Sequence, residues 1–199
     1  MVGRRFIFDP PDRFVAGALG QPGQRAFFLQ ASKGSAQLSV AVEKVQVALL
    51  AERIGELIDA LSRQGVEVPA PREAVLTSWL PAGTTVHAAP PTLREPVVET
   101  FRVGALTIAW DDTRRDLVIE AFEIGDEPNE PEDGSGDDDA LDPDDDRDVM
   151  RVRIGLGDAR TFAEGAMAVV AAGRPPCPVC GEPLDPQGHI CLRRNGYVQ

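Results

Sequence analysis

The end of the chain carries a set of side chains that typically bind metal. All three cysteines and one of the two histidines lie within the last 25 residues, as Cys177, Cys180, His189 and Cys191. The Cys-Pro-Val-Cys-Gly run is typical of a tight turn that presents two thiolates to one ion, because proline stiffens it and Gly181 permits a positive φ after the second ligand. Three thiolates and one imidazole complete the tetrahedral shell of a structural zinc site. The sequence therefore predicts one Zn²⁺ held by these four residues.

Two other interpretations of the cysteines stay open. A Cys-x-x-Cys pair can be a redox dithiol, but such pairs usually lie at the start of a helix, and Pro175, Pro176 and Pro183 disfavour a helix on either side. A structural disulfide would leave one cysteine unpaired, and nothing else in the sequence indicates an oxidising compartment. The His-x-Cys spacing is shorter than usual and can chelate if Ile190 turns outward.

An acidic segment at residues 126–148 accounts for the whole net charge of −12, because it holds thirteen acidic residues and one basic residue. It contains almost no apolar residues, so it cannot bury enough surface to offset its ordering entropy, and we predict disorder. A calcium-binding loop at Asp142, Asp144 and Asp146 is a more specific interpretation of this segment. It fails because Arg147 replaces the required glycine and Arg153 stands in place of the bidentate glutamate.

Short β-prone runs fill the first 42 residues. They cover residues 5–9, 14–19, 25–32 and 36–42, and the turn sequences between them predict an antiparallel meander. From Glu43 onward, apolar residues recur every three or four positions, which predicts an amphipathic helix ending near Gly65. The recurring apolar residues are Val45, Leu49, Leu50, Ile54, Leu57, Ile58 and Leu61.

The second half of the chain repeats this order. Residues 97–103, 105–111 and 116–124 are predicted to be strands, with a hairpin turn at residues 111–115. Residues 149–154 alternate as a further strand, and residues 158–172 are predicted to be a helix. Its apolar residues are Phe162, Ala166, Met167, Val169 and Val170.

These patterns predict an α+β fold in which two helices pack on antiparallel strands. Both halves run from antiparallel strands through a last strand into a helix. An internal duplication would explain this, and so would the general frequency of strand-to-helix transitions. Residues 1–125 and 149–173 are expected to form one domain, interrupted by the acidic segment and followed by a zinc-binding tail at residues 174–199.

Three stretches carry a resemblance to a known family. They are Phe-x-Phe-Asp-Pro-Pro-Asp-Arg-Phe-Val-Ala-Gly near the start, Phe-Phe-Leu-Gln-Ala at residues 27–31, and the closing Cys-Pro-x-Cys-Gly … Gly-His-x-Cys … Asn-Gly-Tyr. The chain resembles, over nearly its whole length, an uncharacterised family of actinobacteria, a domain of unknown function. The resemblance implies an actinobacterial origin and a cytoplasmic setting, and it implies no catalytic residue. Leu192 stands where the closing motif of the family has a proline.

The sequence favours a non-enzymatic function. His87, the one histidine outside the tail, lies in a predicted loop with no neighbouring nucleophile pattern, and no phosphate-binding glycine loop is present. We therefore expect a zinc-binding interaction or regulatory module with a cytoplasmic protein partner. No run of residues approaches the roughly 18 apolar residues that span a bilayer, so no membrane partner is expected.

Two alternative functions remain. One is a hydrolase-type enzyme whose site is assembled across the sheet. The other is nucleic-acid binding through the zinc-binding tail, where Arg174, Arg193 and Arg194 flank the ligands. The second is disfavoured because the folded part is neutral and the acidic segment would repel phosphates.

Replacing Cys180 by serine tests the metal prediction. The wild-type protein, purified without chelator, is expected to contain one zinc per chain by elemental analysis, and the variant well under one. The variant is expected to keep the far-UV circular dichroism of the α+β domain, because the tail follows the second helix and adds little apolar surface. A global loss of the signal would show that the zinc site is part of the core.

Overall fold

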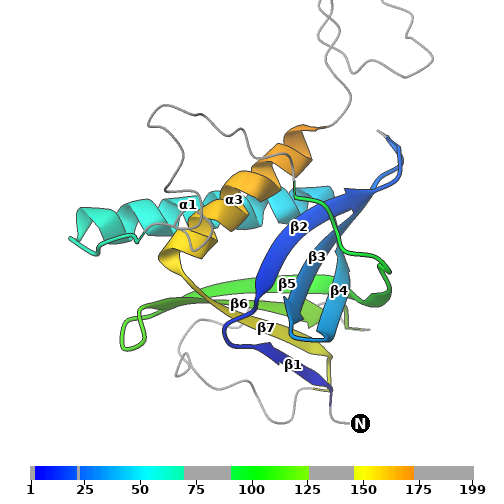
Figure 1. Ribbon diagram of the computed structural model, residues 1–199, viewed down its shortest axis with the longest axis horizontal. Helices are drawn as coiled ribbons and strands as arrows, with labels where there is room; N and C mark the ends of the chain where they lie inside the picture. Colours follow the sequence, from blue (N-terminus) through cyan, green and yellow to red (C-terminus); the bar gives the residue numbers. More distant parts are fainter. Residues whose placement is uncertain (1–2, 22, 70–90, 126–145, 173–199) are drawn as a thin grey trace, which may run out of the picture.

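The computed structural model describes residues 3–21, 23–69, 91–125 and 146–172, and it confirms the α+β prediction (Figure 1). One seven-stranded sheet has the order β1-β7-β6-β5-β4-β3-β2. The strands are β1 (Arg5–Phe8), β2 (Arg13–Leu19), β3 (Ala26–Lys33), β4 (Ala36–Val42), β5 (Glu99–Asp111), β6 (Asp116–Glu123) and β7 (Val149–Gly155). The helices are α1 (Lys44–Arg63) and α3 (Leu156–Ala171).

The connection between β1 and β2 forces the sheet to curl. These are the two edge strands, yet only residues 9–12 lie between them. A connection of this length reaches about 17 Å at full extension. A flat sheet of this many strands would hold its edges about 29 Å apart. Figure 1 shows the result, in which the half of the sheet formed by β2, β3 and β4 is turned across the half formed by β5, β6, β7 and β1.

The meander prediction is confirmed for β2, β3 and β4, which pair antiparallel in sequence order. It is wrong for the first strand, because β1 pairs parallel with β7 at the far end of the sheet. The Asp-Pro-Pro-Asp sequence at residues 9–12 explains the difference. Its two prolines lack N–H groups and fix φ, so the chain does not turn back into a tight hairpin.

The two predicted strands at residues 97–103 and 105–111 are one strand, β5. Its register with β6 shifts between Val103 and Ala105, which marks an irregularity at Gly104. A Cβ at Gly104 would lie 2.8 Å from the Cα of Ile124, so this close approach requires glycine. The hairpin turn at residues 111–115 is confirmed, and Arg115 donates its N–H to the carbonyl of Asp111 at 2.7 Å.

The two halves of the sheet share one order of pairing. In each, three antiparallel strands lead into a helix: β2-β3-β4-α1 and β5-β6-β7-α3. The halves join through the parallel pair β4 and β5, and β1 lies parallel to β7 in the same way. The repeated order expected from the sequence is therefore present in the topology.

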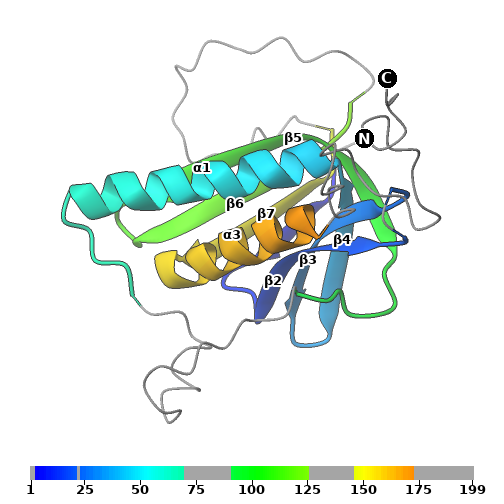
Figure 2. The same ribbon diagram turned by 90° about the horizontal axis from the view of Figure 1, so that it is seen from above.

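Both helices lie on one face of the sheet, and they pack side by side (Figure 2). Buried residues of α1 include Val47, Leu50, Ile54 and Ile58. The apolar pattern of the sequence also contains Val45 and Leu49, but these side chains are 62% and 50% exposed. They lie on the side of α1 opposite the buried residues, because the helical period of 3.6 places Val47 rather than Val45 over the sheet.

Helix α3 fills the space between the two halves of the curled sheet. It contacts β2 from one half and β6 and β7 from the other. The rings of Phe14 on β2 and Phe162 on α3 stack with their centroids 4.4 Å apart. Met167, which belongs to the apolar pattern of this helix, is 47% exposed. The core thus forms on the inner face of the sheet, beneath both helices.

Residues 91–98, here called the strap, cross the outer face of β2, β3 and β4. Gln30, 1% exposed on β3, anchors the strap. Its side-chain amide donates to the carbonyl of Arg94 at 3.0 Å, and its oxygen accepts the Arg94 N–H at 2.8 Å. The same amide also donates to Ser39 Oγ at 3.0 Å. A Cβ at Gly17 would lie 2.4 Å from Leu93, so the strap packs directly on β2.

Neither helix in the described part of the chain is long and apolar enough to cross a membrane.

Substitution of Gln30 tests the role of the strap anchor. Gln30→Ala removes the acceptor of the Arg94 N–H and the donor to the hydroxyl of the buried Ser39, so we expect the free energy of unfolding in urea to fall by about 1–3 kcal/mol. Gln37→Ala is the matched control, because the exposed Gln37 side chain also donates to strap carbonyls, at 3.1 and 3.3 Å. The control should lose less than about 1 kcal/mol. Equal losses would contradict the assignment of Gln30 as the anchor.

Candidate functional site: the outer polar face of the sheet

The predicted zinc ligands, Cys177, Cys180, His189 and Cys191, lie outside the described residues, as does His87. Within the described ranges, no group of three or more His, Cys, Asp and Glu side chains could hold a metal ion. The zinc site therefore stays a prediction. The polar groups that the structure does bring together lie on the outer face of β5, β6, β7 and β1, which points away from the helices.

Cross-strand pairing builds the centre of this face. Glu120 on β6 lies opposite Arg151 on β7, and the two form an ion pair with Arg151 Nε 3.1 Å from Glu120 Oε1. Thr107 on β5 lies opposite Glu120 and donates its hydroxyl to Glu120 Oε2 at 3.2 Å. Both charged side chains are only 16% exposed. Val118 and Val149 on the same face are buried as well, so the face combines ion pairs with apolar surface.

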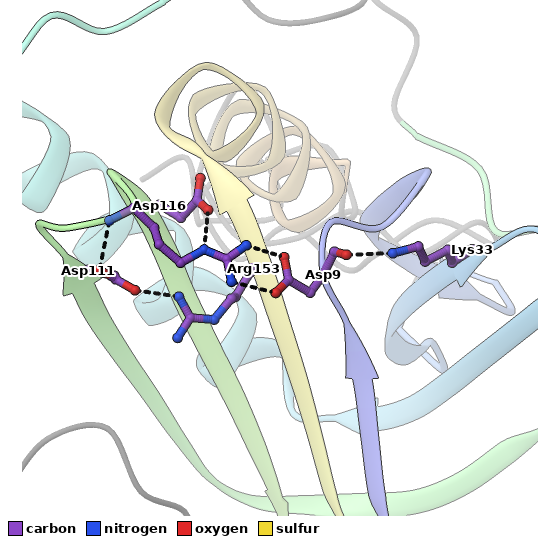
Figure 3. Close-up of polar contacts among 6 residues, drawn as sticks. Asp9, Lys33, Asp111, Asp116 and Arg153 are labelled. Atoms are coloured by element: carbon purple, nitrogen blue, oxygen red, sulfur yellow. Dashed lines mark hydrogen bonds and ion pairs between the residues drawn. The ribbon is translucent and has the colours of Figure 1, made fainter.

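A cluster of charged residues closes one end of this face, where β1 ends and the β5–β6 hairpin turns (Figure 3). Arg114 in the turn binds both carboxylate oxygens of Asp9, at 2.8 and 2.9 Å. Arg153 on β7 donates to Asp111 at 2.6 Å. The cluster therefore ties β1 and β7 to the hairpin. Its carboxylates and cations are equal in number, so it is neutral: Asp9, Asp111, Asp116, Lys33, Arg114 and Arg153.

The pKa of Asp111 is held below its usual range, first by the backbone N–H of Arg114 and then by the side chain of Arg153. These donors stabilise the ionised form, so Asp111 is a carboxylate at neutral pH. A general acid or base near neutral pH needs a carboxyl pKa that is raised. The arrangement at Asp111 instead favours a structural and binding role.

A second ion pair holds the other end of β1. Asp148 is 7% exposed and accepts three hydrogen bonds from Arg4, from the backbone N–H at 2.8 Å, from Nε at 2.9 Å and from Nη2 at 2.5 Å. The pKa of Asp148 is lowered, mainly by the Arg4 side chain. The sequence placed Asp148 at the end of a solvated acidic segment. The structure differs, because the backbone N–H of Asp148 also donates to Glu123 at the end of β6, while Arg4, its other partner, directly precedes β1.

The sequence explains some of these contacts and not others. It indicated a turn role for Asp111, and the carboxylate does accept the Arg114 N–H at 2.9 Å. The pairing of Asp111 with Arg153 was missed, because 42 residues separate them. One signal was available: Arg151 and Arg153 alternate with apolar residues along β7, and this spacing places both on one face of a strand.

Fold and face together define a curled α+β domain whose outer face carries paired charges. A family model described as "Protein of unknown function (DUF3090)" matches residues 6–191, so the chain belongs to this family. The match confirms the resemblance to an uncharacterised family. It begins within β1 and ends at Cys191, the last predicted zinc ligand. Comparison with curated proteins finds no match, and neither does comparison with solved structures.

Asp148→Asn tests the ion pair that holds β1. At neutral pH we expect the free energy of unfolding to fall by about 1–3 kcal/mol, because the charge-assisted hydrogen bonds to Arg4 are weakened. The folded pKa of Asp148 lies below its unfolded value of about 3.9, so this contribution is present above that pH and is lost as the pH falls through the folded pKa.

Thermal unfolding from pH 7 to pH 3 checks this dependence. The gap between wild type and Asp148→Asn should narrow below about pH 4. Asp146→Asn, two residues earlier at an exposed position, is the control and should match the wild type throughout. A gap that stays constant to pH 3 would show that packing, and not charge, causes the loss.

Proposed function

We propose that this protein is a non-enzymatic, cytoplasmic zinc-binding protein that binds another protein. In this account Cys177, Cys180, His189 and Cys191 hold one structural Zn²⁺, and the α+β domain is the scaffold that carries the metal-binding tail. A Cys3His set fills all four positions of the ion, which suits a structural role, because a catalytic zinc keeps one position open for water or substrate.

The extent of the family match carries the proposal. The match extends from residue 6 to residue 191, a range that includes both the domain and all four predicted ligands. The tail is therefore part of the same family unit as the domain. A terminal extension unrelated to the function would not be expected inside that unit.

The charge pattern of the outer face supports binding over hydrolysis. Glu120 and Asp111 each pair with an arginine, and the pKa of Asp111 is lowered. The lowered pKa makes Asp111 a poor general acid or base at neutral pH. The charge also disfavours nucleic acid as the partner, because a chain with a net charge of −12 repels the phosphate backbone.

A pull-down with paired histidine variants tests the proposal. His189→Ala removes a predicted ligand, and His87→Ala removes the only other histidine as a matched control. Tagged full-length proteins are compared in extract of the native cytoplasm, and zinc is measured in each. We expect the wild type and His87→Ala to bind zinc and to retain the same partner protein, and His189→Ala to lose both.

Two further measurements address the alternatives. A gel shift with random nucleic acid at several salt concentrations is expected to show no binding, and a screen with generic ester and phosphate substrates no turnover. Turnover that survives in His189→Ala would contradict the proposal in favour of an enzyme. A salt-dependent shift that requires zinc would assign the tail to nucleic-acid binding.

A further inference from the structure

Strand β5 loses its neighbour on one side where β4 ends. The parallel pairing of β4 with β5 stops at Ala41 and Arg102, and the chain then leaves the sheet to begin α1. On its other side, β5 stays paired with β6 as far as Asp111. Among the described residues, no strand pairs with residues 105–111 on the side that β4 has left, here called the open edge. Alternate residues of an antiparallel strand direct their N–H and C=O groups away from the partner, so the open edge presents backbone groups that can bind a further strand.

The burial of facing residues reflects this missing neighbour. Three residues of β5 on the inner face pack against the core but are only partly buried: Leu106, Ile108 and Trp110. The residues that pair with them on β6 are 0% exposed: Ala121, Ile119 and Leu117. The two sets lie on the same face, one strand apart, so the difference follows from the open edge. A further strand beside β5 would bury the partly exposed set, and this burial favours binding.

The sequence of the open edge favours pairing. Exposed edge strands are usually very short or blocked by lysine or proline. Residues 105–110 have the sequence Ala-Leu-Thr-Ile-Ala-Trp, which contains neither a charge nor a proline and includes residue types that favour strands. The edge strand β1, by contrast, has only four residues and carries Arg5. The open edge therefore has the composition of a surface that pairs.

Helix α1 covers the open edge on the inner side of the sheet. At the point where β4 ends, its Gln46 donates to the carbonyls of Val103 and Gly104, both at 3.3 Å. Leu57 lies on the same flank of α1, because eleven residues are close to three helical turns. It is partly buried and packs against the core. A strand added at the open edge would therefore lie beneath this flank and direct alternate side chains toward Leu57.

The position of α1 decides what can bind there. The helix contacts β5 and runs along it (Figure 2). Paired strands lie about 4.8 Å apart, so two copies of β5 paired edge to edge would bring their α1 helices to a similar separation. Packed helices need about 8–10 Å between their axes. A second copy of the open edge is thus excluded by its own helix, and an extended segment without a covering helix fits.

We propose that the open edge binds an extended segment of a partner protein as an added antiparallel strand. Apolar residues at alternate positions of the segment face α1, and small uncharged residues lie between them. Asp112, at the end of the edge, is exposed and accepts a hydrogen bond from Trp110 Nε1 at 3.3 Å. A lysine or arginine at the start of the segment meets this carboxylate, because antiparallel pairing brings the start there. The surface needs neither zinc nor the tail, so this inference goes beyond the proposed function.

A labelled peptide, Lys-Val-Thr-Val-Thr-Val-Thr, tests the inference on the full-length protein. Fluorescence anisotropy should show saturable binding, and saturating peptide should slow amide hydrogen exchange at residues 105–111 by about tenfold. The control peptide Lys-Val-Val-Val-Thr-Thr-Thr has the same composition without the alternation. It loses the apolar contact of at least one valine and should bind about tenfold more weakly. Absent or equal binding of the two peptides, or binding without slowing at residues 105–111, would overturn the proposal.

Variants locate the binding on the protein. Leu57→Lys places a charge against the apolar side of the bound strand and should weaken peptide binding by about tenfold or more. Val45→Lys is the matched control, because Val45 is a 62% exposed apolar residue on the same helix, and it should bind as the wild type does. Unchanged binding by a folded Leu57→Lys protein would contradict the site. If that variant fails to fold, the exchange result on the wild type decides.

Two further outcomes name other occupants. His189→Ala should bind the peptide as the wild type does, whether or not the protein holds zinc, and loss of binding would assign it to the tail and overturn the proposal. Exchange at residues 105–111 that slows without peptide, as the protein concentration rises, would assign the open edge to a second copy of the chain and would overturn it as well.

Discussion

The connection of four residues between the two edge strands is the constraint on which the rest of the structure depends. It brings β1 and β2 together, so the sheet must curl and its inner face becomes a concave surface. Helix α3 fills that concavity. Its Phe162 stacks on Phe14 of β2, the strand that follows the connection. Asp9, the first residue of the connection, is held in turn by Arg114 of the β5–β6 hairpin. The curl and the polar cluster are therefore parts of one arrangement.

The two faces of the sheet stabilise the domain in different ways. The inner face buries apolar side chains beneath both helices. On the outer face, the strap covers one half through Gln30, and ion pairs such as Arg151 with Glu120 cross the other half. Burying a charged group is costly unless it is paired, and pairing is what the register of β6 and β7 provides. The charged side chains of Glu120, Arg151, Asp111 and Arg153 on the outer face are thus paired with one another.

Local patterns in the sequence predicted the elements, and long-range contacts lay beyond them. The β-prone runs of β2 to β4 and the helical spacing of apolar residues from Glu43 onward are local patterns. The sequence could therefore predict these elements and the α+β class directly. The parallel pairing of β1 with β7 joins residues about 144 apart, as in Arg5 with Val149, and no periodicity reports such a contact. Gln30 follows three apolar residues in the sequence, and its contact with the strap is seen only in the fold. The four zinc ligands stay a prediction, which rests on the restriction that zinc chemistry places on residue type and spacing.

X-ray absorption at the zinc edge, on protein purified without chelator, tests the central claim most directly. The account predicts a four-coordinate zinc with three sulfur neighbours at about 2.3 Å and one nitrogen at about 2.0 Å, and no water in the shell. Such a shell requires every cysteine of the chain and one histidine. A shell of oxygen and nitrogen atoms alone, or one with an open position taken by water, would contradict a structural Cys3His site and with it the account of the tail.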